Sequence, residues 1–181
     1  RLCAALAQEG FTSDDDDALQ GERRYRRPER VLFVRGETVF MLIDYPQVSH
    51  RILSQAMDSL ANLFRARGRE RAFTVLQTTT VYVCFVARSD SPHNDSLGRY
   101  ITSTGGAVLI PVILVPDINQ VVYPAVEEKV GTLRPRIEYL QYLLHERREP
   151  VNIHEQTIRT FYIFLGIVAI LVIAMILGTL A

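Results

Sequence analysis

The chain has 181 residues, and about 160 remain when its apolar C-terminal tail is set aside, which is the length of one domain. Lysine and arginine together number 20, as do aspartate and glutamate, so no overall field favours nucleic acid as a partner. The two cysteines, Cys3 and Cys84, form neither a disulfide framework nor a CxxC metal pair. The sequence starts at Arg1 without a signal-peptide pattern, which leaves open a cleaved targeting segment or a missing one.

Residues 1–29 carry charge without apolar periodicity. Four aspartates occupy positions 14–17, and the run RRYRRPER from residue 23 to residue 30 holds five arginines. We therefore predict a solvated, mobile N-terminal arm. Arginines with an interleaved aromatic residue suit anionic lipid headgroups or an acidic protein surface, and the alternative is a plain solvated linker. The candidate anion-binding residues are Arg23, Arg24, Arg26 and Arg27.

A hairpin and a helix are predicted next. Two β-branched, apolar runs flank Gly36-Glu37, a pair that suits a two-residue turn, so strands are expected at 30–35 and 38–44. Pro46 suits the first turn of a helix and Gly68 its end. Between them, apolar residues recur at spacings of three and four: Val48, Ile52, Leu53, Ala56, Met57, Leu60, Leu63 and Phe64.

The second half of the domain continues with strands and one more helix. Residues 72–88 have strand composition and are long enough for two strands or one bent strand. A polar loop follows, and then the apolar run 107–117, whose Pro111 argues against an unbroken central strand. An apolar stripe over 133–144 predicts a helix that Pro150 stops.

This order of elements predicts an α+β fold: a small antiparallel-sheet domain with two packing helices, followed by a single C-terminal transmembrane helix. The chain divides into the charged arm 1–29, the domain 30–149, a juxtamembrane segment 150–160 and the membrane helix 161–181. Over Arg30 to Leu144 the order resembles that of longin-like and roadblock-like domains, which often work at membranes. No residue motif of either family accompanies the resemblance.

The membrane helix is predicted from residues 161–181, which contain no charged residue. Twenty-one helical residues rise about 30 Å, the thickness of a hydrocarbon core. Gly166, Ala174 and Gly178 are small residues that would let a neighbouring helix approach closely. Since the segment has no ionisable group, a proton relay or ion pathway within it has no support.

The topology has two alternatives. Arg147, Arg148 and Arg159 precede the apolar run, which places the N-terminal domain on the cytoplasmic side, or the matrix side in a mitochondrion. The sequon Asn94-Asp95-Ser96 favours a luminal domain if it is glycosylated. The sequence does not name the membrane.

Motifs that carry chemistry are not found. His50, His93, His145 and His154 lack metal-ligand spacing, and the aspartate run lacks that of a calcium loop. Gly105-Gly106 lacks the lysine of a phosphate-binding loop. Cys84 lies in an apolar run, where a thiol acts as a small hydrophobe. We therefore expect no catalytic residue, no cofactor and no bound metal.

The predicted function is that of a non-catalytic, single-pass subunit of a multi-protein membrane complex, which assembles through its helix and its domain. Its expected partners are other membrane-protein subunits and the bilayer, and not nucleic acid. The alternative is a tail-anchored adaptor of longin-like type that recruits soluble partners in trafficking. A membrane-bound enzyme would need a pocket that joins distant residues such as His50, His93 or Cys84.

Overall fold

The computed structural model describes residues 2–13, 22–31, 34–45, 47–70, 77–88, 94–104, 106–125, 133–144 and 155–179. The helices are α1 (Leu2–Gln8), α2 (His50–Glu70), α3 (Asn94–Leu97), α4 (Arg134–Leu143) and α5 (Glu155–Thr179), with short 3-10 turns η1 (Gly98–Tyr100) and η2 (Pro116–Ile118). The strands are β1 (Thr12–Ser13), β2 (Glu22–Val31), β3 (Val34–Asp44), β4 (Gln77–Val86), β5 (Thr102–Thr104), β6 (Ala107–Val115) and β7 (Gln120–Val122).

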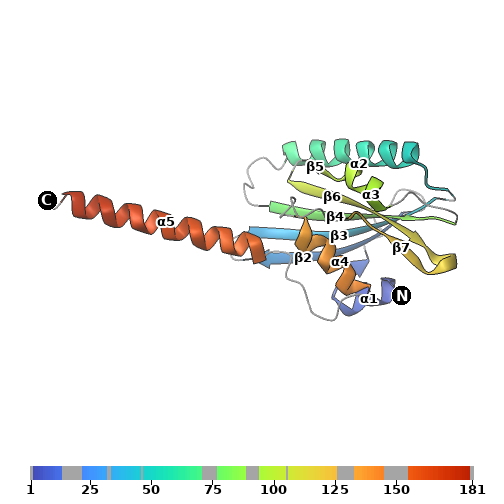
Figure 1. Cartoon of the computed structure of the whole chain (residues 1–181), viewed down its shortest axis with the longest axis horizontal. Helices are drawn as coiled ribbons and strands as arrows, with labels where there is room; N and C mark the ends of the chain where they lie inside the picture. The colour runs from blue at the N-terminus through green and yellow to red at the C-terminus, as the bar shows by residue number, and fades with distance from the viewer. Residues whose placement is uncertain are drawn as a thin grey trace.

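The strands form one mixed sheet with the order β1-β2-β3-β4-β6-β5, and β7 also pairs with β6 (Figure 1). Its centre is parallel, because β3, β4 and β6 run in the same direction. The pairs on either side of this centre are antiparallel: β1 with β2, β2 with β3, and β5 and β7 with β6. The helix α2 connects β3 to β4 and returns the chain to the end at which β3 begins.

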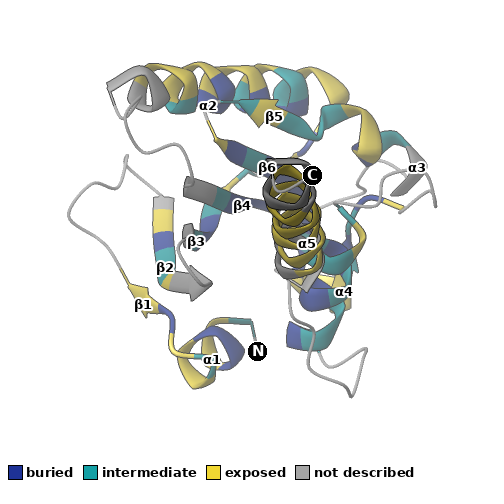
Figure 2. Cartoon of the chain, turned by 90° about the vertical axis from the view of Figure 1, so that its left-hand side faces the viewer, coloured by how far each residue is buried: buried dark blue, intermediate teal, exposed yellow. Residues whose placement is uncertain are grey.

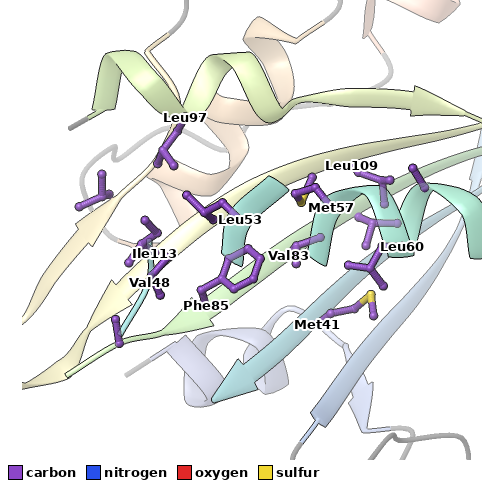
Figure 3. Close-up of a cluster of buried hydrophobic side chains, with 14 of the residues drawn as sticks. Met41, Val48, Leu53, Met57, Leu60, Val83, Phe85, Leu97, Leu109 and Ile113 are labelled. Carbon is purple, nitrogen blue, oxygen red and sulfur yellow. The ribbon is translucent and has the colours of Figure 1, made fainter. Parts of the chain in front are cut away.

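One face of the sheet packs against α2. Alternate residues of the central strands point to this face, as the two-residue period of a strand requires. Figure 3 shows Met41, Val83 and Phe85 from the strands meeting Leu53 and Met57 from α2. Ala61 is buried and Leu63 is exposed. The predicted apolar stripe of α2 included Leu63 and omitted Ala61, so the structure differs from the prediction at these two positions.

The opposite face packs against α1 and α4 (Figure 2). Phe40 and Tyr82, from adjacent strands, stack with ring centroids 4.5 Å apart, and Phe11 meets Phe40 edge-on at 5.3 Å. Leu6 from α1 and Leu140 from α4 are fully buried in the same cluster. The domain therefore has an apolar cluster on each face of its sheet.

The predicted α+β class is confirmed, but the predicted antiparallel sheet is wrong at its centre. The strands β3, β4 and β6 are covered on both faces, and their sequences are continuous apolar runs of the kind that parallel strands carry. A helix between two parallel strands also explains the position of α2.

The hairpin and the charged N-terminal segment also differ from the prediction. The strands β2 and β3 form the hairpin, with Val31 opposite Val34, so the predicted pair Gly36-Glu37 is not its turn. Gly36 lies within β3, opposite Glu29. The arginine run expected in a mobile arm forms β2, because a strand can send its charged residues alternately to both faces and keep its backbone paired.

Pro111 lies inside an unbroken β6, contrary to the prediction. Bonds from Thr79 N to Gly106 O (2.9 Å) and from Ala87 N to Leu114 O (2.8 Å) show that even-numbered residues of β6 bond to β4. Pro111 therefore points its backbone nitrogen to the other edge. There the pairing with β5 ends at Leu109 and the pairing with β7 starts at Ile113. The missing N–H costs no ladder bond at this position.

The helix α5 projects from the domain at the end of the sheet where β3 and β4 begin (Figure 1). Its described large side chains from Tyr162 to Ile173, and Met175, are exposed. Within the described part of the chain, no helix meets the length and apolarity that a membrane crossing requires.

Candidate functional site

The four candidate arginines of β2 do not share one surface. Arg24 lies opposite Met41, whose side chain packs on the α2 face, and Arg26 follows on that same face. Arg23 and Arg27 belong to the other face, with Tyr25 between them. Arg23 is exposed, Arg24 is buried, and the other two are half-buried. The strand therefore separates a cluster that is continuous in sequence, and anion binding by these residues stays a prediction.

Arg27 connects three elements of the domain. Its guanidinium nitrogen Nη1 donates to the backbone oxygen of Glu9 at 3.2 Å and lies 3.4 Å from the Glu9 carboxylate. The guanidinium carbon also lies 4.8 Å from the ring centroid of Phe11 and 5.2 Å from that of Tyr139. Cations at such positions are attracted to the face of a ring. The contacts of Arg27 hold β2 to the segment after α1 and to α4.

Glu9 also binds α4. The phenol of Tyr142 donates to Glu9 Oε1 at 3.1 Å, and this bond raises the pKa of Tyr142, with the nearby negative charge raising it further. We name Glu9, Arg27 and Tyr142 the Glu9 clamp. It is a charge-assisted network at the junction of α1, β2 and α4.

Arg26 and Arg136 are also engaged within the domain. Arg26 Nε lies 4.0 Å from Glu37 Oε1, and the backbone oxygen of Arg26 accepts a bond from the Thr12 hydroxyl at 3.2 Å. Arg136 Nε donates to Thr80 Oγ1 at 2.9 Å, and the Tyr82 hydroxyl donates to the Arg136 backbone oxygen at 2.7 Å. The second pair of bonds fixes the first turn of α4 to β4.

The histidines and cysteines do not gather at one place in the described structure. His50 Nδ1 lies 3.0 Å from the Tyr100 hydroxyl, and this contact joins the start of α2 to η1. His93, His145 and His154 lie outside the described residues. Cys84 is buried, and burial raises the pKa of its thiol, with exposed Cys3 as a second cause. Among the described residues, no group of three or more potential ligands surrounds a metal position.

Asn94, the sequon residue, starts the short helix α3, where a loop was expected. The candidate helix-packing residues Gly166, Ala174 and Gly178 all lie in α5. A Cβ built on Gly166 would meet no atom within 4 Å, so this position is open. The side chain of Ala174 lies outside the description.

Sequence reasoning missed the contacts that fix α1 and α4 to the sheet. Glu9 and Tyr142 are 133 positions apart, and Thr80 and Arg136 are 56 apart. No local spacing pattern predicts such pairs. Most of the described polar contacts join elements of the domain to one another.

Comparison of the chain with protein families, with curated proteins and with solved structures found no match in any of the three.

Proposed function

We propose that the chain is a non-catalytic, single-pass subunit of a multi-protein membrane complex. One observation carries the proposal: α5 leaves a domain whose apolar clusters are complete without it, and its own large apolar side chains are exposed. Ile170 is 67% exposed and Met175 is 74% exposed. A helix with apolar residues on all sides needs lipid or other helices around it.

The sequence supports insertion of this helix into a bilayer. The described exposed residues belong to the run 161–181, which is free of charge and about 30 Å long as a helix. The proposed membrane segment therefore includes positions at the end of α5 whose side chains the structure does not describe. Arg159 is exposed just before the run, which favours a domain on the cytoplasmic or matrix side.

A role in assembly, beyond anchoring, is supported by the open position at Gly166 and by the pair Ala174 and Gly178. Small residues allow the backbone of a neighbouring helix to approach, and helix association in lipid depends on such packing. The partners we propose are other membrane-protein subunits. We infer the absence of a catalytic role from the polar contacts described above, because these contacts hold α1 and α4 on the sheet.

The test is extraction of the full chain from its membrane in mild detergent, followed by native mass measurement. We expect a complex with other subunits. Replacement of Gly166 and Gly178 by isoleucine should release the chain as a monomer. Val172→Phe adds bulk about 120° or more around the helix from these positions and should leave the complex intact. Recovery of the unmodified chain as a lone monomer would contradict the proposal.

A tail-anchored adaptor is the second candidate. It is favoured by the same completeness of the domain, since neither apolar cluster includes a residue of α5. A chain that ends after Leu144 discriminates between the two. The adaptor would still bind a soluble partner without its tail, whereas the subunit would fail to assemble.

A further inference from the structure

Residues 2–13 form a small unit at one edge of the domain, and we name them the N-terminal strap. They contain α1 and β1. In the strand order β1 is the last strand on its side, and it pairs with β2 through Thr12 opposite Arg26 and Ser13 opposite Tyr25. Figure 2 shows α1 on the side of the sheet opposite α2. An isolated helix shorter than about 12 residues is marginally stable in water, and α1 has 7. The strap therefore keeps its structure only through its contacts with the rest of the domain.

The strap is held by a small set of contacts. Its buried side chains are Ala5, Leu6 and Phe11. Its polar anchor is the Glu9 clamp, in which the side chains of Arg27 and Glu9 are 23% and 31% exposed. Segments with little buried apolar surface and partly exposed polar contacts are those that open locally while the remaining structure stays folded. The strap has both features.

The rest of the domain has contacts of its own. The helix α4 is bonded to β4 from Arg136 Nε to Thr80 Oγ1 at 2.9 Å, and from the Tyr82 hydroxyl to the Arg136 backbone oxygen at 2.7 Å. Ile137 and Leu140 of α4 are buried against the sheet. Among the described residues, the apolar cluster on the α2 face includes none from the strap. Release of the strap therefore leaves the sheet, α2 and α4 in place.

The strap covers Cys84. Leu6 of α1 and Cys84 of β4 are buried in the same cluster. Burial raises the pKa of the Cys84 thiol, and the charge of Cys3 raises it further, so the first turn of α1 lies near Cys84. Val83, the residue before Cys84, is buried in the cluster under α2. Opening of the strap therefore exposes position 84 and leaves position 83 covered.

We propose that the strap opens as a unit while the rest of the domain stays folded, and that the Glu9 clamp is the latch that keeps it closed. The open form uncovers the apolar side chains beneath the strap, Phe40 and Cys84 among them. The clamp thus controls the exposure of this face of the sheet. Strap opening does not depend on the insertion of α5 proposed above, so either can fail without the other.

The test compares the thiol reactivity of two buried positions in the full chain, held in detergent micelles. One preparation is Cys3→Ser, in which Cys84 is the remaining thiol, and the other is Cys3→Ser/Cys84→Ser/Val83→Cys. N-ethylmaleimide is kept dilute, so that labelling is slower than reclosing and its rate reports the population of the open form. The labelling rate in the folded chain divided by the rate in denaturant is the opening ratio. We expect this ratio to be roughly tenfold or more higher at Cys84 than at position 83, since partial opening needs less free energy than global unfolding.

A disulfide between β1 and β2 identifies the strap as the part that opens. Thr12 and Arg26 are directly opposed, and opposed residues of antiparallel strands have Cα atoms about 4.5 to 5.5 Å apart, within the range of a disulfide. In Cys3→Ser/Thr12→Cys/Arg26→Cys, oxidation locks the strap, and the opening ratio at Cys84 should fall to the value at position 83. Reduction of the same chain should restore the higher ratio, with peptide mass spectrometry separating Cys84 from the two added thiols.

Two matched substitutions test the latch. Glu9→Gln removes the charge that Arg27 binds and should raise the opening ratio at Cys84 roughly tenfold. Glu138→Gln breaks the ion pair of 3.0 Å with Arg134, whose side chain is 65% exposed. Such a pair within α4 contributes little, so this control should change the ratio by less than about twofold.

A core substitution separates strap opening from global unfolding. Leu60 is buried in the cluster under α2, and its contacts are the same whether the strap is closed or open. Leu60→Ala should therefore raise the opening ratio at position 83 and leave that at Cys84 unchanged.

Equal opening ratios at the two positions would mean that the domain opens only as a whole, which overturns the proposal. A higher ratio at Cys84 that persists in the locked chain would assign the opening to α4 and overturn it as well. If Glu9→Gln left the ratio at Cys84 unchanged, the Glu9 clamp would not be the latch.

Discussion

The phenol of Tyr142 donates a hydrogen bond of 3.1 Å to the carboxylate of Glu9, and this contact joins α4 to the end of α1. Arg27 binds the same carboxylate from β2 at 3.4 Å. Three segments distant in sequence therefore share one acidic side chain. The N-terminal helix, which sequence analysis assigned to a mobile arm, is held on the domain by this clamp and by buried Leu6.

The Glu9 clamp predicts that the phenol of Tyr142 loses its proton at a higher pH than a free tyrosine does. The pKa of Tyr142 is raised, so the stability it contributes is present below its unfolded pKa of about 10 and is lost as the pH rises through the raised value. The stability lost in Tyr142→Phe should therefore be largest near neutral pH and shrink in alkali. Absorbance titration of the phenols, with urea unfolding at each pH, checks this. Tyr45→Phe is the control and should retain the phenol with the raised pKa. If that phenol were still present in Tyr142→Phe, its assignment to Tyr142 would be wrong.

Phe40 should be among the most sensitive positions of the core. It is fully buried, stacks on Tyr82 and meets Phe11 edge-on. Phe40→Ala should reduce the free energy of unfolding by about 3 to 5 kcal/mol, because both transfer energy and packing are lost. Leu63→Ala, at a side chain that is 40% exposed, should change it by about 0.5 kcal/mol or less. Chemical denaturation followed by circular dichroism measures both, and equal losses would contradict the assigned core.

The edge position of Pro111 predicts opposite results at adjacent residues. Pro111→Ala adds an N–H at an edge where β6 has no assigned partner, and should cost about 1 kcal/mol or less, mainly through the freer unfolded chain. Val112→Pro removes a backbone donor that faces β4 and should cost about 3 kcal/mol or more. Thermal unfolding of the two variants measures the difference. If Pro111→Ala were the more damaging change, the deduced direction of the backbone bonds would be wrong.

The two thiols should differ in reactivity. Cys3 is exposed, whereas Cys84 is buried and the pKa of its thiol is raised by that burial, so the reactive thiolate is rare. A thiol reagent near neutral pH should modify one cysteine in the folded chain and two in denaturant. Mass spectrometry of digested protein identifies the site. Rapid labelling of Cys84 in the folded chain would show that the α1 and α4 side of the sheet opens.

Much of the secondary structure follows from sequence. The apolar period of α2 and the β-branched run of β4 were predicted, because each element buries its own stripe or face. The full length of β2 was not predicted, because its arginines interrupt the alternation of apolar and polar residues that is typical of a strand. The direction of β4 was also missed, since a parallel strand and an antiparallel strand both need a buried apolar run.

The candidate site divides in the same way. Sequence placed Arg23, Arg24, Arg26 and Arg27 together, and the alternation of β2 separated them between two faces. The meeting of Arg27 with Glu9 and Tyr139 could not be predicted from their spacing. It depends on the packing of α1 and α4 on the same face of the sheet, which is a property of the topology.

The sequence by itself determined the local elements and the uncharged C-terminal run, because hydrophobic period, turn residues and the absence of charge act over short stretches of chain. Only the tertiary structure decided which strands are parallel, that Pro111 lies at an edge without an assigned partner, and that Glu9 meets Tyr142. Those outcomes depend on contacts between residues far apart in the chain. Such contacts form only once the order of the strands in the sheet is set.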